Sequence, residues 1–142
     1  MTITRCLYSV FVAVMLEFFV ASSGCFAARL YPEKLYQNLW CDSYGGIAEF
    51  LLPDNTRVDC VLSDYAIEFD FANKWSEAIG QSLYYGYCLN KTSAIVLIME
   101  NYESDKKYLT RLNKIASLYG IKVWTIGPDY VENFANTKIV KK

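Results

Sequence analysis

A continuous apolar run in the second half of the chain most constrains the fold. The run, SAIVLIM, covers residues 93–99 and contains no charged side chain. A strand with one face in water alternates apolar and polar residues, whereas a strand with an uninterrupted apolar sequence has both faces covered. The run therefore predicts a strand inside a sheet, with other parts of the chain packed on both of its sides.

The segments around this run predict an α/β domain with the element order α-β-β-β-α-β-α-β. Apolar periodicity and turn residues place these elements at 33–41, 47–52, 57–62, 66–71, 75–89, 93–99, 104–119 and 121–126. Short turns join the first three strands as an antiparallel meander, and strand–helix crossovers follow. We therefore expect a mixed sheet with helices against it. Gly127 and Pro128 should end the last strand, and the residues after them form a tail.

Residues 1–28 predict a signal peptide or an N-terminal membrane anchor. A basic residue precedes an apolar run at 6–16, and small residues follow it, as in a secretory signal. Glu17 is unusual beside such a run, so an uncleaved anchor and a mis-assigned start are alternatives, and the second would make the protein cytoplasmic. The run is shorter than the ~20 residues of a spanning helix. The remainder, 29–142, suffices for one domain with a modest core.

The absence of histidine narrows the chemistry open to this chain. The sequence contains no histidine and has a formal net charge of −1. Ser-His-Asp and Cys-His nucleophile systems and histidine metal sites are therefore excluded. The balanced charge gives no overall field that attracts nucleic acid, so such binding needs a local basic patch. Any reaction must use carboxylates, lysine, tyrosine or cysteine.

Of the five cysteines, two lie in the N-terminal segment and three lie in the domain. Cys41, Cys60 and Cys88 allow at most one internal disulfide and leave one thiol over. The chain has no CxxC spacing, so we expect no zinc site. Cys60 and Cys88 are most simply interpreted as small buried apolar residues.

Carboxylates gather on one face of the predicted meander. Successive side chains of a strand point to opposite faces, so Asp59 on the second strand, and Glu68 and Asp70 on the third, lie opposite the apolar residues. Glu49 on the first strand could join them. Clustered carboxylates either acquire raised pKa values or bind a cation, and oxygen ligands suit Mg²⁺ or Mn²⁺. The alternative is a polar face of the strands in contact with solvent.

The following helix adds a stripe of polar residues beside this cluster. Lys74, Ala78, Gln81 and Tyr85 are spaced i, i+4, i+7 and i+11, which places them on one side of a helix. Such a stripe next to carboxylates indicates the wall of a site. The alternative is a polar surface face with Tyr85 half-buried.

Together these residues resemble a known superfamily. Asp59, the triplet EFD at 68–70 and the segment QSLYY at 81–85 are similar to the PD-(D/E)XK nucleases, especially the RecB-like branch with its QxxxY motif. The resemblance covers residues 33–126 and implies a restriction-endonuclease-like core and a metal-dependent phosphodiesterase that cleaves DNA or RNA. The metal would be Mg²⁺ or Mn²⁺.

The resemblance also implies a role for each candidate residue. Asp59 would be the first metal-binding acid and Glu68 the acid of the triplet, with Asp70 beside them. Gln81 and Tyr85 would orient the substrate or the lysine. The extra acid that many members carry would be Glu49, or Glu33 on the first helix; the implied metal ligands are Glu49, Asp59, Glu68 and Asp70.

One position departs from the pattern of the superfamily. Asp70 stands where the lysine of the triplet belongs, and Lys74 at the start of the next helix is the candidate that replaces it. If Lys74 does not reach the carboxylates, the protein would be a catalytically inactive binding protein on the same fold. A small exported interaction protein with an acidic surface is the third interpretation.

A basic stripe is the candidate surface for nucleic acid. Lys107, Arg111 and Lys114 are spaced i, i+4 and i+7 on the later helix, and such a row of cations suits contacts with phosphates. The alternative is an ordinary solvated helix face. The sequence does not indicate an oligomeric state.

Overall fold

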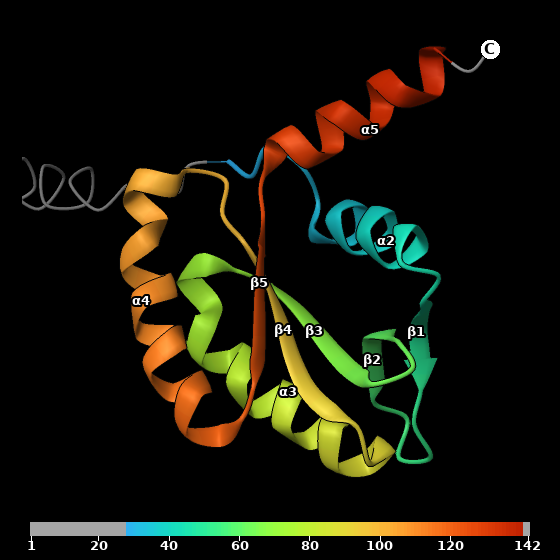
Figure 1. The fold of residues 1–142 in the computed structure, drawn as a ribbon, viewed down its shortest axis with the longest axis vertical. Helices are drawn as coiled ribbons and strands as arrows, with labels where there is room; N and C mark the ends of the chain where they lie inside the picture. Colours follow the sequence, from blue (N-terminus) through green and yellow to red (C-terminus); the bar gives the residue numbers. More distant parts are fainter. Residues whose placement is uncertain (1–27, 141–142) are drawn as a thin grey trace, which may run out of the picture.

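The computed structural model describes residues 28–140 of the chain, and side chains as far as residue 136. A five-stranded sheet runs through the centre of the fold, with helices on both faces (Figure 1). The signal or anchor was predicted at 1–28, and its residues 1–27 lie outside the described residues. Among the residues that are described, no helix is long and apolar enough to cross a membrane.

The observed elements confirm the predicted fold class and order and add a short 3₁₀ helix and a C-terminal α-helix. In chain order they are α2 (Glu33–Ser43), β1 (Ile47–Leu51), β2 (Arg57–Val61), β3 (Tyr65–Phe71), the short 3₁₀ helix η1 (Ala72–Lys74), α3 (Trp75–Leu89), β4 (Thr92–Ile98), α4 (Tyr102–Tyr119), β5 (Lys122–Ile126) and α5 (Pro128–Val140). The strands lie in the order β1-β2-β3-β4-β5. β1, β2 and β3 pair antiparallel, and β3, β4 and β5 pair parallel.

The expectation that the chain ends in a tail after Pro128 is wrong, because α5 begins at that residue. A proline is tolerated in the first turn of a helix, where its missing N–H has no partner to lose. Gly127 and Pro128 therefore end β5 and also begin a helix. Val131 of α5 is buried against the same cluster as α2.

The two faces of the sheet have different covers. On one face, α2 and α5 pack on alternate residues of β3 and β4, among them Phe69 and Val96. On the other, α3 and α4 pack on Ile95 and Leu97, and Figure 1 shows the two helix pairs on opposite sides. β4 is buried from Ala94 onward, so the prediction of an interior strand is confirmed.

A disulfide joins α2 to β2. Cys41 and Cys60 are bonded across a sequence separation of 19 residues, and a loop of this length contributes about 3 kcal/mol of stability. A Cβ atom on Gly46 would lie 2.6 Å from the sulfur of Cys60, so only glycine fits beside the bond. The interpretation of Cys60 and Cys88 as unbonded buried residues is wrong: Cys60 is buried but bonded, and Cys88 is a free thiol on an exposed residue.

Candidate functional site

Four carboxyl groups interact around the centre of β3. They come from three elements: Glu33 from the first turn of α2, Asp59 from β2, and Glu68 and Asp70 from β3. Each of the other three raises the pKa of Glu68 by its charge. Three of the four are residues that the strand alternation placed together.

Asp59 occupies a gap in the backbone pairing of the sheet. The pairing of β2 with β3 covers Cys60 and Val61, and its pairing with β1 passes from Cys60 to Val58. At this position a side chain replaces a backbone acceptor: Oδ2 of Asp59 accepts a hydrogen bond of 2.8 Å from the Phe69 N–H. Burial raises the pKa of Asp59 to about 6, although this hydrogen bond opposes the shift.

Glu68 is buried, with only 5% of its surface exposed. Its Oε2 receives no hydrogen bond from an N–H or hydroxyl group of the described residues, but the side chains of Glu68 and Asp59 are hydrogen-bonded to each other. Burial raises the pKa of Glu68 far above its ordinary value, and the charges of Asp59 and Asp70 raise it further. Without a cation, the pair of Glu68 and Asp59 therefore holds a proton at neutral pH.

The alternative of a polar side in contact with solvent is wrong for β3. Glu68 and Asp70 are both buried, at 5% and 3% exposure, and they stand beside Ile95 and Leu97 in the parallel register. Because β3 is an interior strand, α3 and α4 cover the face that strand alternation alone would leave in water. The carboxyl groups are therefore held inside the domain.

Lys74 reaches the carboxyl cluster at Asp70. Its Nζ lies 3.6 Å from Asp70 Oδ1, and its side chain is 48% exposed. Burial raises the pKa of Asp70 to about 6, the positive charge of Lys74 opposes this rise, and the charge of Glu33 adds to it. Lys74 thus contacts Asp70, the residue at which the resemblance predicts a lysine.

The predicted helix stripe faces the cluster only in part. Tyr85 is buried, and its pKa is raised by burial and by the charges of Glu68 and Asp59. A hydrogen bond from Gln81 acts against that rise, but Gln81 itself is exposed. Ala78 is fully buried and forms part of the core between α3 and the sheet.

Glu49 is paired with side chains of α2, although it lies near enough to Asp59 to add to the rise in the Asp59 pKa that burial causes. Its carboxylate forms an ion pair of 2.5 Å with Lys34 and accepts a hydrogen bond of 2.9 Å from Gln37. These two contacts lower its pKa. Its backbone has a φ of +56°, a conformation that is uncommon for a residue with a side chain. Of the two candidates for the extra acid, Glu33 acts by its charge on Glu68 and Glu49 acts by its charge on Asp59.

Gln37 is a site residue that the sequence analysis did not identify. Its side chain is buried, and Nε2 donates both to Glu49 and to the backbone oxygen of Asp59. The available signal was its position one helical turn before Cys41, on the face of α2 that meets the sheet. A polar amide on that face requires partners in the interior.

The oxygen atoms of the carboxyl cluster are suitable ligands for a divalent cation. Carboxylate oxygens are the ligands that Mg²⁺ and Mn²⁺ prefer, and the Oε2 of Glu68, which receives no N–H or hydroxyl hydrogen bond from the described residues, is a buried acceptor that a cation would satisfy. Within residues 28–136, however, no three acidic, cysteine or histidine side chains stand together as a formed metal site. The predicted set Glu49, Asp59, Glu68 and Asp70 is therefore not preassembled.

The basic stripe lies on the exposed side of α4. Lys107, Arg111 and Lys114 are all exposed. The Nζ of Lys107 lies 4.8 Å from the centre of the Tyr108 ring, and the guanidinium of Arg111 lies 5.7 Å from it. These cations are accessible to a polyanion.

Comparison with known proteins gives no relative of this chain. No family model, no curated protein and no solved structure matches it. The function therefore has to be inferred from the chemistry of the carboxyl cluster and from the resemblance of its motifs.

Proposed function

We propose that the chain is a metal-dependent phosphodiesterase that cleaves nucleic acid. The observation that carries this proposal is Glu68, a buried carboxyl group with three further carboxyl groups around it and with one oxygen that receives no N–H or hydroxyl hydrogen bond from the described residues. A buried polar atom without a partner costs stability. Such an arrangement is favoured where it serves a site, and the order of Asp59, the triplet at 68–70 and the motif at 81–85 supports nuclease chemistry.

Each residue of the cluster has a task in this proposal. Asp59 and Glu68 would bind Mg²⁺ or Mn²⁺, which supplies a polarised phosphate and an activated water molecule. The pair of Glu68 and Asp59 must release its proton before both can act as ligands. Lys74 would stabilise negative charge on the phosphate from its position beside Asp70. Lys107, Arg111 and Lys114 would bind the nucleic-acid backbone.

We also propose that the protein acts outside the cytoplasm, either exported or anchored to a membrane. The buried Cys41–Cys60 disulfide supports this location, because such bonds form and persist in oxidising compartments. The signal-like sequence at 1–28 is the second support.

Cleavage of plasmid and single-stranded DNA by the whole chain, as Mg²⁺ or Mn²⁺ is titrated, tests the proposed function. We expect cleavage that requires the metal and stops with a chelator. Asp64→Asn is the matched control, since it removes one acidic charge from an exposed turn outside the cluster, and it should cleave at the normal rate. Cleavage that continues with the metal removed would contradict the mechanism.

A non-catalytic nucleic-acid-binding protein is the second candidate. The observation that favours it is Asp70, an acid where the superfamily has its lysine. The same titration separates the two candidates, because metal-stimulated DNA binding without any cleavage would support the second and reject the first.

We expect Lys74→Met to lower the cleavage rate by about 10²-fold, because it removes the positive charge that opposes negative charge at the phosphate. It should also raise the pKa of Asp70 above about 6, since Lys74 holds that pKa down. Single-turnover cleavage and an NMR titration of Asp70 measure the two effects. Lys106→Met is the control, as Lys106 pairs with Glu103 on the surface of α4. A normal rate for Lys74→Met would remove Lys74 from the mechanism.

A further inference from the structure

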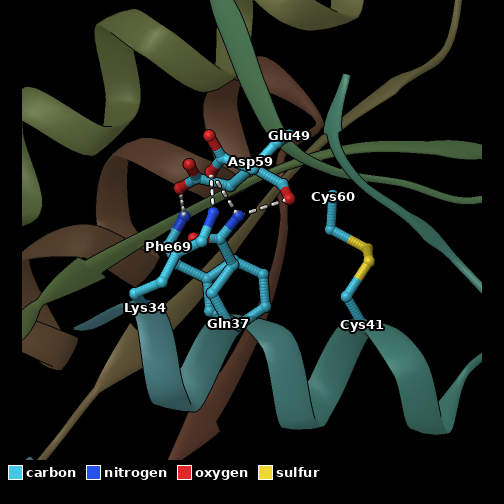
Figure 2. Close-up of polar contacts among 7 residues, drawn as sticks. All are labelled: Lys34, Gln37, Cys41, Glu49, Asp59, Cys60 and Phe69. Atoms are coloured by element: carbon cyan, nitrogen blue, oxygen red, sulfur yellow. Dashed lines mark hydrogen bonds and ion pairs between the residues drawn. A yellow bond between two sulfur atoms is a disulfide. The ribbon is translucent and has the colours of Figure 1, made fainter. Parts of the chain in front are cut away.

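Helix α2 is fastened to strand β2 at two consecutive residues of the strand. Cys60 is bonded to Cys41, and the backbone oxygen of Asp59 accepts a hydrogen bond of 2.6 Å from Gln37. Gln37 and Cys41 are one helical turn apart, so both project from the same side of α2. Figure 2 shows Gln37 pointing from the helix toward Asp59 and Glu49, with the disulfide one turn further along. We call Gln37 and the disulfide the latch.

The latch contacts Asp59, the residue of β2 that is paired with neither β1 nor β3. Asp59 appears in neither the β1–β2 register nor the β2–β3 register. Its backbone is held by Gln37, and its side chain is held by the Phe69 N–H at 2.8 Å. The other hydrogen of the Gln37 amide goes to Glu49 at 2.9 Å. The place of Asp59 therefore depends on how closely α2 is held to the sheet.

The latch lies in the core and is closely packed. Cys41 and Cys60 are fully buried, and Gln37 is 3% exposed. Gly46 packs so near the sulfurs that a Cβ there would lie 2.7 Å from Cys41 Sγ. Two unbonded thiols need a van der Waals separation in place of a bond length. We therefore expect loss of the disulfide to shift α2 relative to β2, since Gly46 packs directly against both sulfurs.

We propose that the Cys41–Cys60 disulfide and Gln37 form a latch that positions Asp59, so that loss of the disulfide loosens the carboxyl cluster while the domain remains folded. Only the consequence for metal binding and cleavage rests on the proposed function. The reductant is a dithiol, which reaches the buried bond when the domain opens transiently. It transfers two electrons and two protons, the sulfur–sulfur bond breaks, Cys41 and Cys60 become thiols, and the dithiol becomes a disulfide.

The test compares the oxidised whole chain, the chain reduced by dithiothreitol, and Cys41→Ala/Cys60→Ala. All three carry Cys6→Ser, Cys25→Ser and Cys88→Ser, so that Cys41 and Cys60 are the only positions where the three forms differ in their thiols. Two quantities are measured: the hydrogen exchange of the Phe69 amide and the affinity for Mg²⁺. In the two forms without the disulfide, we expect Phe69 exchange to be about tenfold faster and Mg²⁺ affinity to fall by about tenfold. The amides of β4 should keep their protection.

Gln37→Leu tests the latch with the disulfide intact. If the double cysteine variant does not fold, this variant tests whether the contacts of α2 position Asp59. It should reproduce the faster exchange at Phe69, whereas Asn38→Leu on the next residue of α2 should not. The proposal is overturned if Phe69 exchange and Mg²⁺ affinity stay unchanged in the folded reduced protein, or if Gln37→Leu leaves Phe69 protected. Faster exchange at Phe69 in a protein that neither binds Mg²⁺ nor cleaves would support the latch and reject the proposed function.

Discussion

Replacing Glu68 with glutamine is expected to abolish metal-dependent cleavage while making the metal-free protein more stable at neutral pH. The amide keeps the shape of the side chain but cannot offer a charged oxygen to a cation. Because Glu68 Oε2 is the buried acceptor that receives no N–H or hydroxyl hydrogen bond from the described residues, we expect a loss of about 10³-fold in the cleavage rate. Glutamine has no proton to bind, so the variant also avoids the free energy that wild-type folding spends on protonating Glu68 at neutral pH, and the metal-free protein should be more stable.

Single-turnover cleavage at saturating Mg²⁺ and urea unfolding without metal measure the two effects of Glu68→Gln. The surface variant Asp64→Asn should change neither quantity. Normal cleavage by Glu68→Gln would show that Glu68 is not a ligand. A loss of stability in that variant would show instead that the carboxyl group has a structural role in the core.

Much of the fold could be predicted because local patterns and tertiary packing agree. The apolar run at 93–99 requires cover on both faces, and the observed β4 has it. The helix predicted at 75–89 matches α3, since its apolar spacing, its length and the turn at Asn90 agree. Helix α5 was missed because Gly127 and Pro128 are as suitable for beginning a helix as for ending a strand.

The candidate site was predictable only where strand alternation decides it. Alternation brought Glu68 and Asp70 together, but it could not show that helices cover both faces of β3. It therefore left open a solvent-facing acidic surface, which the observed burial contradicts. Lys74 reaches Asp70 because η1 turns the chain immediately after β3, and the spacing of four residues was the available signal.

The contacts of α2 depend on packing that no local pattern specifies. Three cysteines allow three pairings, and the choice of Cys41 with Cys60 follows from α2 lying on β2. Glu49 contacts Lys34 and Gln37 and has a positive φ. The neighbouring residues do not predict this backbone conformation. Gln37 itself resembles any polar helix residue until the partners of its amide are known.

We expect the metal-free protein to lose stability as the pH rises from about 4 to about 7. The folded pKa values of Asp59 and Asp70 are raised to about 6, and that of Glu68 is raised further. A carboxyl group with a raised folded pKa binds more protons in the folded state than in the unfolded state. Its contribution is complete below the unfolded pKa and is lost as the pH rises through the folded pKa. For Asp70, a rise from 3.8 to about 6 corresponds to about 3 kcal/mol.

Urea unfolding at several pH values between 4.5 and 7.5, with chelator or with Mg²⁺, measures this loss. The lowered pKa of Glu49 acts in the opposite direction but below this range, so the decline reports the buried groups. Glu68→Gln should make the decline shallower. Mg²⁺ should restore stability at neutral pH, because a ligand that binds only the folded state stabilises it. Stability that rises throughout this range would show that the carboxyl groups ionise freely. If Mg²⁺ reverses the decline, the buried carboxyl groups destabilise only the metal-free protein. The positive charge of the bound cation would then compensate the negative charges that the carboxylates bring into the core.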